Sequence, residues 1–179
     1  MASPLELSEL ILPAWQTNAR VTADLIRSLP VRIYRSPIPG FPRRTVRAMA
    51  VHLHNSRCRW LHTLGQPLGI RVPRPVDSDR EGKPALVRAL RDSARGMTEL
   101  LAIACQRGGQ LPATSRYVWR NLALDVGHIL TYFVGHEAHH RGQLILIARQ
   151  LGHPIPKGPR DDLWWWKPAP GRARGHPAH

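Results

Sequence analysis

Apolar residues recur every three or four positions over most of this 179-residue chain, the spacing that places them on one face of an α-helix. The clearest segment begins near Pro84 and ends at Gly108. Similar segments cover 45–64 and 122–151, and each is followed by glycine, a common residue at helix ends. No segment shows the alternation expected of a strand. The apolar seam of the 84–108 segment is predicted to be core: Val87, Leu90, Ala94, Met97, Leu101 and Ala104.

A further helix is predicted before Pro30, but its start is ambiguous. The sequence Ser3-Pro4-Leu5-Glu6 has the form of a capping box, and Pro13 then interrupts the pattern. The helix is therefore expected to begin near Ser3 with a break at Pro13, or to begin at Pro13 itself. Residues 30–44 form a proline-rich connection and 66–82 a long loop. Four amphipathic helices without strands predict an all-α four-helix bundle.

The chain length suits one domain, which we place at residues 1–166. The segment Asp161-Asp162-Leu163-Trp164-Trp165-Trp166 follows the last helix, and its tryptophans are expected to cover one end of the bundle. Residues 167–179 are rich in Pro, Gly and Arg, and we expect them to be disordered.

The composition favours a soluble cytoplasmic protein. Cys58 and Cys105 are far apart and form no CxxC motif, so we expect core thiols in a reducing compartment. The N-terminus lacks signal-peptide features, and charged residues interrupt every apolar run before it reaches membrane-spanning length. No membrane association is expected.

The formal charge of +14 raises the alternative of a basic, non-catalytic protein that binds nucleic acid. The arginines, however, are scattered over all segments, and no run of five basic residues occurs. Nucleic-acid binding is therefore a weaker hypothesis than the one indicated by the histidines.

The segment His136-Glu137-Ala138-His139-His140 places two imidazoles four residues apart inside a helical pattern. Residues at i and i+4 lie on the same helix face, so His136 and His140 can bind one ion, and the apolar spacing predicts core positions for both. A catalytic zinc site takes three protein ligands and leaves a position open. His52, in the 45–64 helix, is the best-placed third ligand. The alternative is a pair of core histidines held by hydrogen bonds alone.

The same letters satisfy the His-Glu-x-x-His pattern of zinc peptidases, in which the glutamate activates water. The extended form of that motif fails, because Gln143 and Leu146 stand where Gly and His would be. Only Asp161 and Asp162 remain as downstream ligands. The peptidase hypothesis is therefore kept as an alternative.

Several motifs together resemble the DinB/YfiT-like family of small metalloenzymes. They are Trp15 and Asn18, the segment Val51-His52-Leu53-His54-Asn55-Ser56-Arg57 before Trp60, and HEAHHRGQL followed by Ala148-Arg149-Gln150-Leu151-Gly152. The tryptophan-rich end is also similar to that of many members. This resemblance covers the chain from the first helix to the tryptophan segment.

The resemblance implies a bundle of up-down-down-up topology and a divalent metal, zinc or nickel, held by His52, His136 and His140. Some relatives activate a low-molecular-weight thiol such as bacillithiol or mycothiol, so it implies a thiol transferase or isomerase acting on a small molecule. It also implies a homodimer. The sequence leaves the role of Glu137 open between a catalytic base and a group beside the ligands or on the surface. The roles of Arg141 and Gln143 stay open between substrate contact and helix packing or dimer contact.

Overall fold

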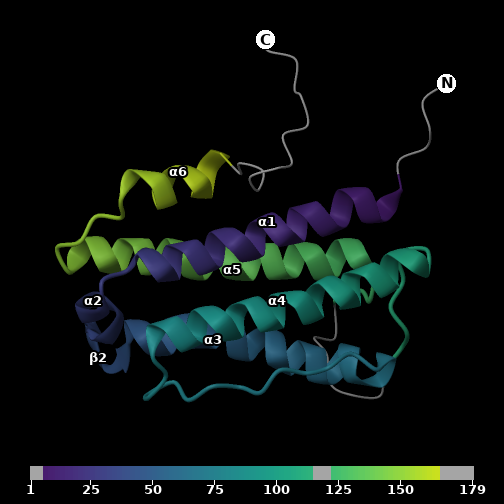
Figure 1. Cartoon of the computed structure of the whole chain (residues 1–179), viewed down its shortest axis with the longest axis horizontal. Helices are drawn as coiled ribbons and strands as arrows, with labels where there is room; N and C mark the ends of the chain where they lie inside the picture. Colours follow the sequence, from purple (N-terminus) through teal and green to yellow (C-terminus); the bar gives the residue numbers. More distant parts are fainter. Residues whose placement is uncertain (1–5, 115–121, 166–179) are drawn as a thin grey trace, which may run out of the picture.

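The computed structural model describes residues 6–114 and 122–165, without the side chains of residues 162, 164 and 165. It is mostly helical, which confirms the all-α class. Helix α1 contacts α4 and α5, and α3 contacts the same two. In Figure 1, α1 and α5 run in one direction while α3 and α4 run in the other. The long helices are α1 (Leu7–Ser28), α3 (Val46–Trp60), α4 (Lys83–Gln106) and α5 (Val126–Gln150).

Helix α1 begins at Leu7 and continues through Pro13, so both predicted starts are wrong. Pro13 cannot donate a hydrogen bond to the carbonyl of Glu9. Glu9 is exposed, so water can satisfy that carbonyl and the helix need not break. Ser3 and Pro4 of the predicted capping box lie outside the described residues.

The other long helices agree more closely with the sequence. The Thr45 hydroxyl caps α3 by accepting a hydrogen bond from the Ala48 N–H at 3.1 Å. The predicted end at Gly65 is reached through a π-helical turn, η1 (Leu61–Gly65). Helix α5 begins four residues later than predicted. There the Asp125 carboxylate caps the helix, and the backbone of Asp125 pairs with that of Gln110 at the start of the α4–α5 connection.

The proline-rich connection contains a short helix, α2 (Val31–Arg35), and an antiparallel hairpin of β1 (Pro37–Ile38) and β2 (Phe41–Thr45). The sequence did not predict the hairpin, because β2 has no buried face and so shows no alternation. After η1 comes a short 3-10 turn, η2 (Gln66–Leu68). The helix α6 (Lys157–Trp165) contacts α1 and was also not predicted.

The core consists of two apolar clusters, one toward each end of the long helices. One contains Leu25, Leu53 and Leu144, and the other contains Trp15, Met97 and Phe133. The predicted seam of α4 is buried except for Ala94, which is half-buried. Between the two clusters, the long helices bury polar side chains. The histidines of interest lie near this middle level of the fold.

In the described residues, every helix is too short or too polar to cross a lipid bilayer. Two predictions lie outside the described residues and side chains. They are the aromatic cover by the side chains of Trp164 to Trp166 and the disorder of residues 167–179.

Candidate metal centre

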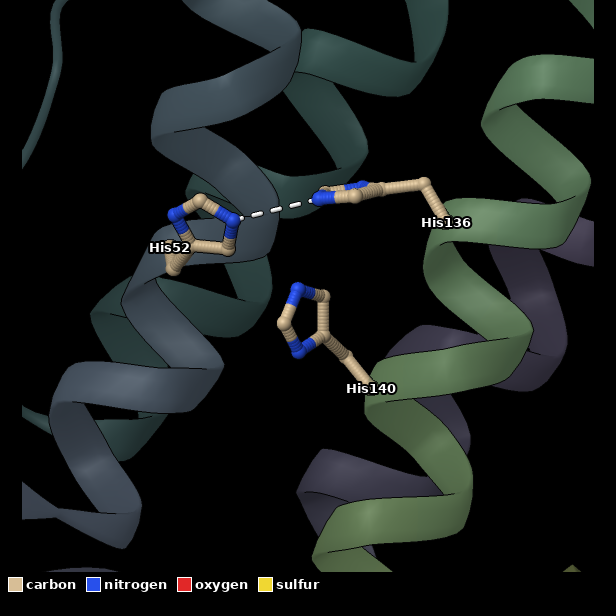
Figure 2. A group of neighbouring side chains, drawn as sticks. All are labelled: His52, His136 and His140. Atoms are coloured by element: carbon tan, nitrogen blue, oxygen red, sulfur yellow. Dashed lines mark hydrogen bonds between the residues drawn. The ribbon is translucent and has the colours of Figure 1, made fainter.

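Three histidine side chains from two helices converge at one place on the side of the fold. Figure 2 shows His52 projecting from α3 toward His136 and His140, which project from α5. The Nε2 atoms of His52 and His136 are 3.1 Å apart. One ring nitrogen from each of the three residues lies within 4.8 Å of the other two. The structure therefore brings together the three residues that the sequence singled out.

This spacing fits a shared metal ion. Imidazole nitrogens lie about 2.0–2.1 Å from zinc in a tetrahedral site, which places two of them roughly 3.3 Å apart. The 3.1 Å separation of the His52 and His136 nitrogens is close to that value, and small rotations of the ring of His140 can close the rest. The three ligands are all imidazole nitrogens, which suit zinc, nickel and other first-row ions.

The histidines are half-buried, so the prediction that they occupy core positions is wrong. The buried face of α5 passes through Phe133, Glu137 and Arg141 instead. The apolar pattern misplaced this face because a hydropathy scale treats Glu and Arg as surface residues, although both can be buried when paired. The three rings therefore lie at the margin of the core, partly exposed to solvent.

The surroundings keep the three rings neutral. Burial, followed by the charges of His140 and His52, lowers the pKa of His136 to about 4. Burial also lowers the pKa of His140. For His52, the pKa is lowered by burial first, then by His140 and by the guanidinium groups of Arg59 and Arg44. Because a metal binds only the neutral imidazole, the site is ready for a metal at neutral pH.

We expect the metal-free protein to lose stability as the pH falls below 6.5. The pKa values of His52, His54, His136 and His140 are lowered in the folded state, so the unfolded chain binds protons first. The free energy of unfolding should have its full value above pH 6.5 and decrease as the pH falls toward the pKa of His136, about 4. Urea unfolding at a series of pH values measures this. His136→Ala should flatten the profile, whereas the same dependence in that variant would contradict the assignment.

Gln143 orients one of the ligands. The Nδ1–H of His140 donates to the Gln143 Oε1 at 2.8 Å, which leaves the Nε2 of His140 with a free lone pair. On the other side, the ring of Tyr132 stacks on His136 with an interplanar angle of 11°. Metal-binding histidines commonly donate their second N–H to a neighbouring group, as His140 does to Gln143. Gln143 thus has a role beside the site that sequence alone left open.

Gln143→Leu should weaken metal binding by about 10–100-fold, the usual effect of losing a partner of a ligand. The matched control is Gln150→Leu, an exposed glutamine at the end of the same helix. Titration with Co²⁺, followed by absorption, measures both affinities. Equal weakening in the two variants would show that the hydrogen bond to His140 is unimportant.

Beneath the histidines lies a group of five buried polar side chains, which we call the polar layer. Their exposed fractions are 0% for Asn18, Thr22 and Glu137, 1% for Arg57 and 7% for Arg141. Arg57 donates from Nε and Nη2 to the two carboxylate oxygens of Glu137, at 2.7 and 2.8 Å. Asn18 and Thr22 donate to the same carboxylate, and Arg141 donates to both of them. The layer joins α1, α3 and α5.

This arrangement argues against the peptidase hypothesis. The base of such an enzyme must reach a water bound beside the histidines. Both carboxylate oxygens of Glu137 instead accept hydrogen bonds in the core, and the side chain is fully buried. Glu137 and Arg141 therefore serve helix packing. For Arg141 this is one of the roles that the sequence left open, whereas the expected surface position of Glu137 is wrong.

Sequence reasoning did not single out Arg57 and Thr22. A signal for both exists, because each interrupts an otherwise apolar ridge: Arg57 follows Ala50 and Leu53 on α3, and Thr22 precedes Ile26 on α1. A charged residue on a core ridge predicts a buried partner of opposite charge on another helix. The identity of that partner depends on which helices face each other.

The other histidines of the described residues, and the two cysteines, do not join the cluster. His128 is exposed and pairs with Asp125, and His139 is exposed beside His140. The buried His54 side chain makes a hydrogen bond to the Arg74 carbonyl, and this bond anchors the loop that follows η2.

Both cysteines are free thiols, as expected. Burial raises the pKa of Cys58 to about 11, so this thiol is a core group rather than a nucleophile. Cys105 is only half-buried, which partly corrects the prediction of two core thiols.

Comparison with known proteins places the chain in a family. A model of the DinB family matches residues 1–167, nearly the whole chain and all three histidines. The chain belongs to the DinB family. No curated protein and no solved structure matches it. Membership of the DinB family agrees with the resemblance seen in the histidine and Trp15–Asn18 motifs, and the three-histidine group is compatible with a metal-binding DinB-like protein.

Proposed function

We propose that His52, His136 and His140 of this DinB-family protein bind one divalent ion, zinc or nickel, as the centre of an enzyme. The observation that carries the proposal is the convergence of three neutral imidazoles within 4.8 Å of one another, at a half-buried position. Three protein ligands leave a coordination position open, as in catalytic rather than structural sites. The opposed directions of the long helices support an up-down-down-up bundle as the scaffold.

We further propose that the substrate is a low-molecular-weight thiol, transferred to an electrophilic small molecule. When bound, the ion would favour the thiolate over the thiol. The sulfur would form a bond to an electrophilic carbon, the leaving group would depart with its electron pair, and the thiol proton would pass to solvent. Arg44 and Arg59 are exposed and make no ion pair with other described residues, and their charges act on His52. They are therefore available to attract the carboxylate of an acidic thiol.

A panel of thiols with a chromogenic electrophile tests this function. The metal-loaded protein should conjugate a carboxylate-bearing thiol, and the metal-stripped protein should not. His139→Ala is the control, because this exposed histidine neighbours the site without joining it. Equal rates with and without metal would overturn the proposal. Absence of metal binding combined with salt-sensitive DNA binding would favour the basic interaction protein suggested by the net charge of +14.

We also propose a single domain over residues 1–166 that acts as a cytoplasmic homodimer. The two free cysteines support a reducing compartment, and the family match over residues 1–167 supports one domain. Sedimentation equilibrium of the full chain tests the dimer: a monomer at all concentrations would contradict it.

A further inference from the structure

The polar layer lies at the same level as the histidines and separates the two apolar clusters. On α1 it falls between Trp15 and Leu25, and on α5 between Phe133 and Leu144. Arg57 also donates from Nη1 to the Leu90 carbonyl at 2.9 Å, which adds the backbone of α4. All four long helices therefore meet in this layer.

Each ligand-bearing helix contributes to the central ion pair close to its histidine. Glu137 directly follows His136 on α5, and Arg57 lies five residues after His52 on α3. The bidentate pair of Arg57 and Glu137 thus joins the same two helices that must present their histidines to one ion. Fixing the pair fixes the relative position of the histidines.

A directional contact sets this position more tightly than apolar burial does. Apolar burial is non-directional, so the clusters above and below tolerate small displacements of one helix along another. Moving α3 by one residue against α5 would shift it about 1.5 Å along its axis and turn it about 100°. The two hydrogen bonds of 2.7 and 2.8 Å between Arg57 and Glu137 would then break, leaving buried charges without partners.

We propose that Arg57 and Glu137 are positioning residues, whose buried ion pair holds α3 and α5 in the one register that brings His52 to His136 and His140. The polar layer supports the pair, since Asn18 and Thr22 both donate hydrogen bonds to the Glu137 carboxylate. This inference rests on the proposed metal site, and it assigns to the HEAHH glutamate a role in geometry instead of proton transfer.

The test compares the affinity for Co²⁺ and the absorption spectrum of the bound ion in variants of the full chain. Arg57→Lys keeps the charge but removes the bidentate fork, and Glu137→Gln removes the carboxylate. Both should bind Co²⁺ at least about tenfold more weakly, with an altered spectrum. Leu100→Ala is the control for stability, because Leu100 is fully buried on α4, which carries none of the histidines. It should lower the unfolding temperature and leave the affinity and spectrum unchanged.

A milder pair of variants decides the question if the charge variants do not fold. Thr22→Val removes one hydrogen bond to Glu137 and retains both charged side chains, Arg57 and Glu137. Thr22→Ser keeps the hydroxyl. Thr22→Val should weaken Co²⁺ binding and Thr22→Ser should recover it. Unchanged affinity and spectrum in every folded variant of the polar layer, or an equal loss in Leu100→Ala, would overturn the positioning role.

The metal-free protein separates failure of this inference from failure of the metal site. NMR can detect the contact between the rings of His52 and His136, whose Nε2 atoms are 3.1 Å apart. The contact should persist in Leu100→Ala and disappear in Arg57→Lys. If the wild type binds no metal, the proposed function fails, and this contact alone tests the positioning role. If the wild type binds metal and the contact survives in Arg57→Lys, only the positioning role fails.

Discussion

His52→Ala should reduce the metal content of the purified protein from about one ion per chain to nearly none. Two imidazoles on one helix rarely retain an ion alone, because a mononuclear catalytic site takes three protein ligands. The affinity for the metal should fall by more than about 100-fold. Losing a group that hydrogen-bonds a ligand already weakens binding by up to about 100-fold, and losing the ligand itself should cost more. Elemental analysis and competition with a chromophoric chelator measure content and affinity.

The control for this prediction is His139→Ala. His139 lies between the ligands in sequence, and its ring centroid is 5.1 Å from that of His140, but its side chain is exposed. This variant should keep its metal. Undiminished, tight metal binding in His52→Ala would mean that α3 contributes no ligand and would remove the central assumption of the proposed site.

Glu137→Gln should lower the free energy of unfolding by about 3–5 kcal/mol, the typical loss when one member of a buried ion pair is removed. Arg57 and Arg141 would remain buried with no carboxylate to balance them. Small domains are stable by about 5–15 kcal/mol, so this variant should be close to unfolding. Urea denaturation of the metal-free protein gives the difference without a contribution from the ion.

An exposed ion pair in the same protein gives the comparison. Asp92 pairs with Arg95 on the surface of α4, with side chains 50% and 73% exposed. Asp92→Asn should change the free energy of unfolding by less than about 1 kcal/mol, because water screens both charges. If Glu137→Gln proved as mild as Asp92→Asn, the buried pair would not hold the helices together.

The buried pair also shows why the function of the HEAHH sequence depends on its surroundings. The letters match a peptidase motif, and the i, i+4 spacing is the same in either case. In this fold the glutamate faces Arg57 in the core, about 100° around the helix from its neighbour His136. His136 and His140 still face His52 on α3, while the glutamate has no access to a bound water.

The sequence by itself determined the helical class, most helix ends and the pairing of His136 with His140. These depend on short-range spacing: 3.6 residues per turn puts residues four apart on one face whatever the rest of the fold does. It also indicated His52 as the third histidine, because only one histidine of the 45–64 helix shares a face with Met49 and Ser56.

Only the tertiary structure decided which face of α5 is buried and what Glu137 binds. Hydropathy alone placed His136 and His140 in the core, because it assigns Glu and Arg to the surface. The energy of burying a charge depends on a partner that lies far away in the sequence, here Arg57, 80 residues before Glu137. That partner is fixed when α1, α3 and α5 pack together. Local spacing therefore defined the three histidines, and long-range packing defined the polar layer beneath them.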